Sequence, residues 1–209
     1  MKLVIFGASG QTGRLLVNQA LESGHEVTVY VRREGAFETG RKGLTIVAGQ
    51  LDDPAKLEQA ITGADVCIST LGGGSLSKRS PELTTGIDRI ITTMERTGVK
   101  RFIYMSSVGA GDSRYYMGPI IRLFIVGIFL RVPLADHTFN EKRIASSGLQ
   151  WTIIRPGGLS NGSKTGKLRH GSDFTKITGN IQISRADVAA FILEQALSTT
   201  YINKAVWLF

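Results

Sequence analysis

The 209-residue sequence predicts an α/β protein built on a single doubly wound, mainly parallel sheet. In one pattern that recurs four times, a helical segment ends near a glycine and a short apolar run follows, at Gly24, Gly63, Gly98 and Gly148. Glycine just past a helix end adopts the left-handed conformation that other residues resist. Nearly continuous apolar strands are expected where helices cover both faces of a parallel sheet. Such βα units in series, joined by right-handed crossovers, favour a doubly wound sheet.

The individual elements are predicted from this pattern and from local start and stop signals. Strands are expected at 2–6, 26–32, 44–48, 65–70, 101–106, 150–155, 181–183 and 204–208. Helices are expected at 11–22, 54–61, 80–97, 134–147 and 185–198. Ser184 opens a capping box that would satisfy free amide hydrogens at the start of the last helix.

No linker or second hydrophobic core is evident, so residues 1–209 are interpreted as one domain. Residues 157–180 are rich in glycine and lack periodicity, which predicts a long loop over the active face. Residues 111–133 show no clear pattern, and two interpretations remain for them: packing in the core, or a flap whose apolar side lines a substrate pocket. These two segments are expected to form the substrate region.

Composition excludes several classes of protein. Cys67 is the one cysteine, so no disulfide can form within the chain, which fits a reducing cytoplasm. The apolar run at 123–130 is too short to span a membrane, and the first strand is too short for a signal sequence. The formal net charge is +8, but the basic residues are scattered, so an anionic cofactor and substrate are expected rather than nucleic acid. No metal-ligand cluster is evident.

The sequence Gly-Ala-Ser-Gly-Gln-Thr-Gly at 7–13 directly follows the first strand and opens the first helix. Gly7 would allow a tight turn, Gly10 would let a pyrophosphate approach the backbone, and Gly13 would let helix and strand pack closely. The helix start would offer unpaired amide hydrogens and the positive end of its dipole to the phosphates. This context predicts an NAD(P)-binding Rossmann fold. The residues expected to contact the cofactor here are Gly7, Ser9, Gly10, Gln11, Thr12 and Gly13.

The end of the second strand indicates which dinucleotide is bound. NAD enzymes usually have an acidic residue there, which accepts hydrogen bonds from the ribose hydroxyls. This chain instead has Arg32 and Arg33, whose guanidinium groups would bind a 2′-phosphate through charge-assisted hydrogen bonds. The expected cofactor is therefore NADP(H), with Glu34 as a residue that would weaken the preference.

Several further segments, taken in order, are typical of a known superfamily. They are residues 29–32, 47–51, 70–73, 105–108, 155–158 and 184–189. With the glycine turn, these segments make the chain resemble the atypical short-chain dehydrogenase/reductase superfamily. More narrowly, it resembles the NmrA-like branch, which includes the biliverdin reductase B (flavin reductase) type. The resemblance covers most of the chain.

The resemblance implies further cofactor contacts in segments that follow the C-terminal ends of strands, where open α/β sheets bind ligands. Gln50 and Leu51 would border the adenine. Leu71, Gly72 and Gly73 would line the nicotinamide side of the dinucleotide.

The ends of two later strands would complete the site. Ser107 matches the family serine near the nicotinamide, with Ser106 beside it as a further cofactor contact. The residues expected to contact the carboxamide or ribose are Pro156, Gly157, Gly158 and Leu159.

Two departures from the family pattern concern the proton donor. Many members have Tyr-x-x-x-Lys, in which the lysine lowers the pKa of the tyrosine; here Lys142 is preceded by Thr138. The biliverdin-type enzymes have a histidine where Gly158 aligns. Reduction of an ordinary ketone needs a matched general acid, whereas a reduced flavin or quinone is a delocalised anion that water can protonate. The expected catalytic residues are Ser107, which would orient the acceptor or carboxamide, and Lys142, which would bias the local potential.

The sequence therefore predicts an NADPH-dependent oxidoreductase that transfers hydride to a flavin, quinone or similar conjugated small molecule. A flavin would enter as substrate rather than as a bound cofactor. The alternative is an NmrA-like regulatory protein that senses NADP(H) with little or no turnover. A sugar-nucleotide epimerase is disfavoured because such enzymes generally need the missing tyrosine. The protein would be cytoplasmic, without a membrane or nucleic-acid partner, and either a monomer or a homodimer.

Overall fold

A computed structural model describes residues 1–72, 80–118 and 130–209. Its main strands are β1 (Lys2–Phe6), β2 (Glu26–Val31), β3 (Leu44–Ala48), β4 (Val66–Ser69), β5 (Arg101–Met105), β6 (Gln150–Pro156), β8 (His170–Gly171) and β10 (Lys204–Leu208). They form one sheet in the order β3-β2-β1-β4-β5-β6-β10-β8, in which the pairing of β10 with β8 is antiparallel and the other pairings are parallel. This order confirms the predicted doubly wound Rossmann fold.

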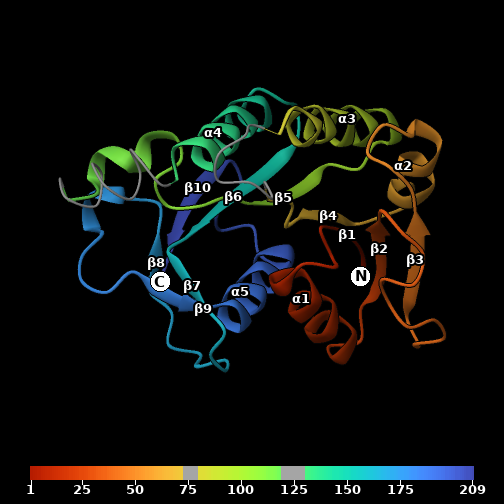
Figure 1. The fold of residues 1–209 in the computed structure, drawn as a ribbon, viewed down its shortest axis with the longest axis horizontal. Coiled ribbons are helices and arrows are strands. Elements are labelled where there is room, and N and C mark those ends of the chain that lie inside the picture. Colours follow the sequence, from red (N-terminus) through yellow and green to blue (C-terminus); the bar gives the residue numbers. More distant parts are fainter. Residues whose placement is uncertain (73–79, 119–129) are drawn as a thin grey trace.

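Helices cover both faces of the sheet (Figure 1). They are α1 (Gln11–Glu22), α2 (Pro54–Ile61), α3 (Pro81–Thr97), α4 (Arg131–Ala145) and α5 (Arg185–Leu197). α1 and α5 pack together on one face, and α2, α3 and α4 lie on the other (Figure 1). Alternate residues of β1 enter the two cores, Leu3 and Ile5 on the α1 side and Val4 and Phe6 on the α3 side. This burial on both faces explains why the strand is continuously apolar.

Most of the predicted boundaries agree with the structure, and β1, β3, β10, α1 and α2 have the predicted bounds. The largest difference for a helix is at α4, which begins at Arg131 rather than 134. Pro133 was expected to precede the helix, but it lies in the first turn, where its missing amide hydrogen is not needed.

The segment 157–180, predicted as a long loop, also contains three short elements. β7 (Gly158–Ser160) pairs with β9 (Gln182–Ser184), β8 pairs with β10, and the 3-10 helix η3 spans Phe174–Lys176. The intervening chain is held by Asp187, whose carboxylate accepts hydrogen bonds from the backbone amides of Thr165 and Gly166 at 2.9 Å each. These contacts join residues far apart in the sequence, so no local periodicity indicates them.

The repeated helix–glycine–strand pattern holds at three of its four positions. Gly24, Gly63 and Gly98 have φ angles of 78°, 77° and 77°, in the left-handed region expected after a helix. Gly148 does not have a positive φ, and α4 already ends at Ser146, whose amide donates to the carbonyl oxygen of Lys142. The capping box at Ser184 is confirmed, since its hydroxyl oxygen accepts the amide hydrogen of Asp187 at 3.0 Å.

The order of the strands reverses between β1 and β4. The chain leaves β1 for α1 on one face, whereas after β4 it leads to α3 on the other (Figure 1). The carboxyl ends of parallel β1, β4, β5 and β6 share one edge of the sheet, and this edge is where such folds bind ligands.

Replacing Gly13 by alanine tests the close approach of α1 to the strand before it. A Cβ there would overlap the carbonyl oxygen of Gly7 and lie 2.8 Å from the Cα of Ala8. We expect Gly13→Ala to lower the free energy of unfolding in urea by about 1–3 kcal/mol, as for other overpacked sites. Gly148→Ala is the control, because nothing lies within 4 Å of its Cβ position. Equal stability of the two variants would contradict this packing.

Candidate functional site

The turn after β1 is held against the end of β4. Gly7 has a φ of 76°, and a Cβ on it would lie 2.8 Å from the backbone nitrogen of Leu71. The hydroxyl of Thr70 donates to the carbonyl oxygen of Gly7 at 3.1 Å, and the amide of Gly10 donates to the same oxygen at 3.0 Å. The two loops at the reversal point therefore form one compact unit.

The start of α1 is free to bind an anion. Gly10 is the N-cap residue, no side chain caps the helix, and its first turn contains no acidic residue. The first intrahelical hydrogen bond runs from the amide of Arg14 to the carbonyl of Gly10 at 2.9 Å, which leaves the amides of Gln11, Thr12 and Gly13 without helical partners. Arg14 also donates to the carbonyl oxygen of Ser9 at 3.1 Å. These amides and this positive charge fit a diphosphate.

Arg32 and Arg33 follow the C-terminal end of β2 and are both exposed. Neither side chain has a hydrogen bond or ion pair with any residue that the structure describes. Arg14 links the glycine turn to the same region, since it donates to the carbonyl oxygen of Ala36 at 3.0 Å and lies 5.1 Å from the ring centroid of Phe37. The structure thus places unpaired guanidinium groups at the edge where a ribose phosphate is expected.

The segment after β3 is held by Tyr30. The tyrosine hydroxyl donates to the carbonyl oxygen of Gln50 at 2.6 Å. Burial, followed by the charges of Asp53 and Asp52, raises the pKa of Tyr30 to about 12, so this donor stays protonated. The side chain of Gln50 is exposed, whereas Leu51 packs against the bare backbone of Gly86 in α3. Of the two residues predicted near the adenine, Leu51 therefore also has a packing role.

The predicted nicotinamide loop is described only in part. Leu71 is half-buried, and its amide lies 3.4 Å from the Ser69 hydroxyl oxygen, which accepts its hydrogen. Gly72 is exposed, and no atom of a described residue lies within 4 Å of its Cβ position. Gly73 lies outside the described residues. The described contacts of this loop are therefore those of Leu71 with the end of β4.

The two serines after β5 differ in their surroundings. Ser106 is 2% exposed, its amide donates to the carbonyl oxygen of Ile154 at 2.7 Å, and its buried hydroxyl has no partner among the described residues. Ser107 is half-buried and its hydroxyl donates to the carbonyl oxygen of Val108 at 3.2 Å. Because buried polar groups normally have partners, the orphaned hydroxyl of Ser106 fits a polar group of a ligand such as a carboxamide.

The segment after β6 contains two glycines with different constraints. A Cβ at Gly157 would overlap the carbonyl oxygen of Ile181, so only glycine fits there. At Gly158 the nearest atom to a Cβ would be Cγ of Gln182, at 3.6 Å, which is ordinary contact. Pro156 is buried and Leu159 is half-buried. Gly157 thus serves backbone packing, while the exposed Gly158 has room for a side chain.

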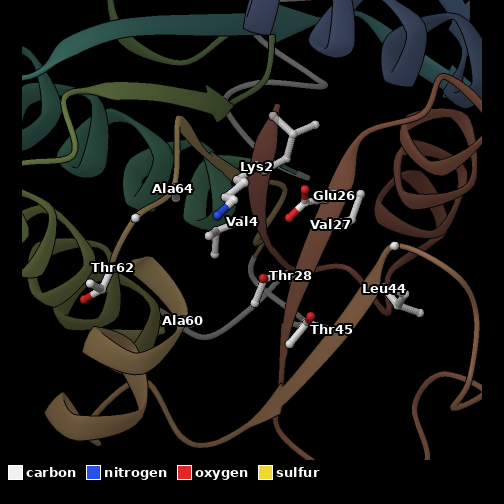
Figure 2. A pocket seen from close by; sticks show the side chains of 13 residues that line it. Lys2, Val4, Glu26, Val27, Thr28, Leu44, Thr45, Ala60, Thr62 and Ala64 are labelled. Carbon is white, nitrogen blue, oxygen red and sulfur yellow. The ribbon is translucent and has the colours of Figure 1, made fainter.

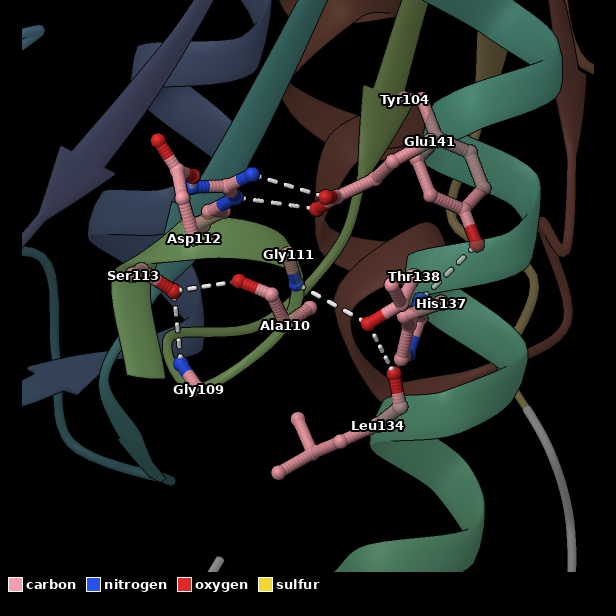
Figure 3. Close-up of polar contacts among 11 residues, drawn as sticks. Tyr104, Gly109, Ala110, Gly111, Asp112, Ser113, Leu134, His137, Thr138 and Glu141 are labelled. Atoms are coloured by element: carbon pink, nitrogen blue, oxygen red, sulfur yellow. Dashed lines mark hydrogen bonds and ion pairs between the residues drawn. The ribbon is translucent and has the colours of Figure 1, made fainter. Parts of the chain in front are cut away.

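No hydrogen bond joins the two predicted catalytic residues, Lys142 and Ser107, within the described part of the chain. Lys142 is exposed on α4 and has no hydrogen bond or ion pair with a described residue. The hydroxyl of Thr138, at the position of the family tyrosine, accepts the amide hydrogen of Gly111 at 2.9 Å and donates to the carbonyl of Leu134 at 2.7 Å (Figure 3). That hydroxyl is fully used in joining the loop after β5 to α4.

A buried polar cluster of Tyr104, His137 and Asn140 lies beneath α4, and the sequence patterns did not indicate it. The Tyr104 hydroxyl accepts a hydrogen from Nδ2 of Asn140 at 3.1 Å. It also lies 2.8 Å from Nδ1 of His137 (Figure 3). Burial raises the pKa of Tyr104, so the phenol stays protonated. Burial also lowers the pKa of His137, although Glu141 and Asp136 oppose the shift. A neutral imidazole therefore shares a hydrogen bond with the phenol, in which the donor depends on the tautomer of the ring.

A cavity of about 390 Å³ lies at the opposite edge of the sheet (Figure 2). Lys2, Glu26 and Leu44, at the amino-terminal ends of β1, β2 and β3, contribute to its lining. Open α/β sheets bind their ligands at the carboxyl ends, so this cavity is not the predicted cofactor site.

Membrane-spanning helices and metal-ligand clusters are both absent from the described part of the chain. Within residues 1–72, 80–118 and 130–209, no helix is long and apolar enough to cross a bilayer. The same residues contain no group of three or more histidine, cysteine or acidic side chains arranged to hold a metal ion.

Comparisons with known proteins agree with this geometry. The sequence profile of a family described as NAD(P)H-binding matches residues 7–199. The crystal structure of ChuY from Escherichia coli O157:H7, described as an anaerobillin reductase, has a TM-score of 0.83 and 27% identity, and the match covers 100% of this chain and 97% of that one. Sanguinarine reductase of Eschscholzia californica is 28% identical over 98% of this chain and 87% of its own. YhfK of Bacillus subtilis, named an uncharacterized sugar epimerase, is 29% identical over 98% and 92% of the two chains.

The buried His137 predicts a particular dependence of stability on pH. Its pKa is below the ordinary 6.5 in the folded state, so as pH falls through 6.5 the unfolded chain binds the proton first. The contribution of neutral His137 to stability is therefore present above pH 6.5 and lost on acidification below it. We expect His137→Gln to show a shallower fall in the free energy of unfolding between about pH 7 and pH 5 than the parent, measured by urea denaturation. Parallel curves would contradict this assignment.

Proposed function

The chain belongs to the NAD(P)H-binding family of atypical short-chain dehydrogenases/reductases, and from this premise we propose an NADPH-dependent reductase of flavins, quinones or similar conjugated molecules. The observation that supports it most is the set of free amides at the start of α1 together with the unpaired guanidinium groups after β2. Two of the similar proteins are named reductases, ChuY and sanguinarine reductase.

The preference for NADPH is argued from charge. A 2′-phosphate bears about two negative charges, and arginine binds phosphate through a planar fork of donors. Arg32 and Arg33 are exposed at the end of β2 and have no described acidic partner that would compete for them. Glu34, which directly follows the two arginines, is also exposed. Its single negative charge does not cancel the two positive charges of Arg32 and Arg33.

When bound, NADPH would supply a hydride, that is, a hydrogen nucleus with two electrons. The bond from this hydrogen to the nicotinamide ring breaks as its bond to the acceptor forms, which leaves NADP⁺. The chain's own residues bind and orient. The Ser106 hydroxyl, buried and unpartnered, is available to the carboxamide, and the half-buried Ser107 lies next along the chain toward the acceptor. Lys142 is too exposed for a close role, so in this proposal it contributes at most a distant positive charge. Water protonates the delocalised anion of the reduced acceptor.

The alternative is an NADP(H) sensor with little or no turnover. It is favoured by the Thr138 hydroxyl, whose donor and acceptor capacities are occupied by Leu134 and Gly111, and by the bare Gly158. Neither position therefore supplies a proton. The choice between the two functions depends on whether the bound cofactor is oxidised by an acceptor.

Substitution of Arg32 tests the cofactor preference. We expect Arg32→Ala to weaken NADPH binding by about 10- to 100-fold, the loss of charge-assisted hydrogen bonds to a phosphate, and to leave NADH binding unchanged. Isothermal titration calorimetry with both nucleotides measures the two constants. Arg89→Ala, which removes an exposed arginine from α3, is the matched control and should bind both as the parent does. Equal losses for NADPH and NADH in Arg32→Ala would refute the assignment.

Turnover tests the proposed reaction. Purified protein with NADPH should oxidise it in the presence of at least one of FMN, riboflavin, biliverdin or a benzoquinone, followed at the absorbance of reduced nicotinamide. Because no side-chain acid is invoked, the rate should fall steeply for a simple aldehyde or ketone. Tight NADPH binding without oxidation by any of these acceptors would favour the sensor.

A further inference from the structure

Arg155, in β6, is the centre of a buried ion-pair network. Its Nε and one terminal nitrogen donate to the two carboxylate oxygens of Glu141 at 2.9 and 2.8 Å, and its other terminal nitrogen donates to Asp112 at 2.6 Å. The side chains of Arg155 and Glu141 are 5% and 6% exposed, but that of Asp112 is 65% exposed. The guanidinium therefore connects the buried face of α4 to a surface segment.

That surface segment is the 3-10 helix η1 (Gly111–Tyr116), which follows Ser107 closely. Several bonds hold its beginning, as Figure 3 shows for Gly111 with Thr138 and for Ser113 with Gly109. The Ser113 hydroxyl also donates to the carbonyl oxygen of Ala110 at 2.6 Å. Together with the bond between Asp112 and Arg155, these contacts fix the orientation of η1 at its first residues. Because Tyr116 is the last residue of η1, its position depends on that orientation.

An aromatic stack extends from the same guanidinium. The Cζ of Arg155 lies 4.9 Å from the ring centroid of Phe174, and Phe174 stacks on Tyr116 with centroids 6.2 Å apart and planes at 27°. Phe174 is 7% exposed, whereas Tyr116 is 46% exposed. Phe174 also packs in a small apolar cluster with Val108, the residue after Ser107. An accessible phenol ring, supported from behind, thus lies on the segment that leaves the predicted nicotinamide edge.

We propose that a planar conjugated acceptor stacks on Tyr116, and that Arg155 is a positioning residue that orients this ring through Asp112 and Phe174. The proposal rests on the reductase function and names the part of the chain that receives its acceptor. Stacking on an aromatic ring suits flavins and bilins, whose extended π-systems prefer offset parallel contact. Since an ion pair with one exposed partner adds little to folding stability, the Asp112 contact matters mainly for the orientation of η1.

Acceptor binding to the complex with NADP⁺ tests the proposal without needing turnover. FMN, riboflavin and biliverdin are titrated separately into the protein saturated with NADP⁺, and the flavin fluorescence or bilin absorbance reports binding. We expect Tyr116→Leu to weaken binding of the preferred acceptor by about 5- to 10-fold, the loss of one stacked ring. Tyr115→Leu is the matched control, because Tyr115, the exposed neighbour of Tyr116, stacks on Arg114 instead. It should change binding less than about twofold.

The positioning role has its own variants. Asp112→Asn should weaken acceptor binding by about threefold, and Arg155→Lys, which keeps the charge but loses the planar fork, by more. Asp88→Asn breaks an ion pair between another acidic residue and Arg143 on α4, in which the arginine is more exposed than Arg155, and should have no effect. The dissociation constant of NADP⁺ should be the same in all variants. In turnover, the Asp112→Asn change should appear in the acceptor KM and leave kcat within about twofold.

The outcomes separate this proposal from the proposed function. Equal effects of the Tyr115 and Tyr116 variants, or of the Asp112 and Asp88 variants, would overturn it while leaving the reductase function standing. So would a parent complex with NADP⁺ that binds none of the three probes yet reduces a quinone. If NADP⁺ itself does not bind, the reductase function fails and this proposal fails with it.

Discussion

The close approach of the first helix to the first strand is the constraint on which the remaining site depends. Gly13 has no side chain to separate α1 from Gly7, and Gly7 turns the chain so tightly that it lies against the end of β4. The first-turn amides of α1 therefore lie beside the loops of the neighbouring strands. The roles predicted for the other cofactor residues all depend on a diphosphate being held at this point.

The two halves of the site are built by different physical means. The half around β1, β2 and β4 uses backbone amides, glycines and exposed arginines, which suit a rigid anionic ligand. The half beyond β5 uses an ion pair in which only Arg155 is buried and a pair of stacked aromatic rings, which would suit a flat and polarisable ligand. Under the proposed function, the first half would hold the hydride donor and the second would receive its acceptor.

The sequence predicted the fold well because the signals for a doubly wound sheet are local. The apolar strands, the capping box at Ser184 and the glycine turn at 7–13 each depend on neighbouring residues, and the structure has them where they were expected. The sequence did not indicate the pairing of β8 with β10, the contact between Tyr104 and His137, or the bidentate bond between Arg155 and Glu141. Each joins residues whose proximity arises only after the sheet is assembled. The role predicted for Lys142 from a family motif stays a prediction, because the structure shows only that its side chain is exposed.

The two neighbouring glycines after β6, Gly157 and Gly158, differ in how closely other atoms surround them. A Cβ on Gly157 would overlap the carbonyl oxygen of Ile181, whereas one residue later the nearest atom to a Cβ is Cγ of Gln182, at 3.6 Å. The two neighbouring positions are therefore under separate constraints. A change at 157 meets the backbone of Ile181, whereas a change at 158 meets first a flexible side chain, so the surface beside β6 can vary while the fold is kept.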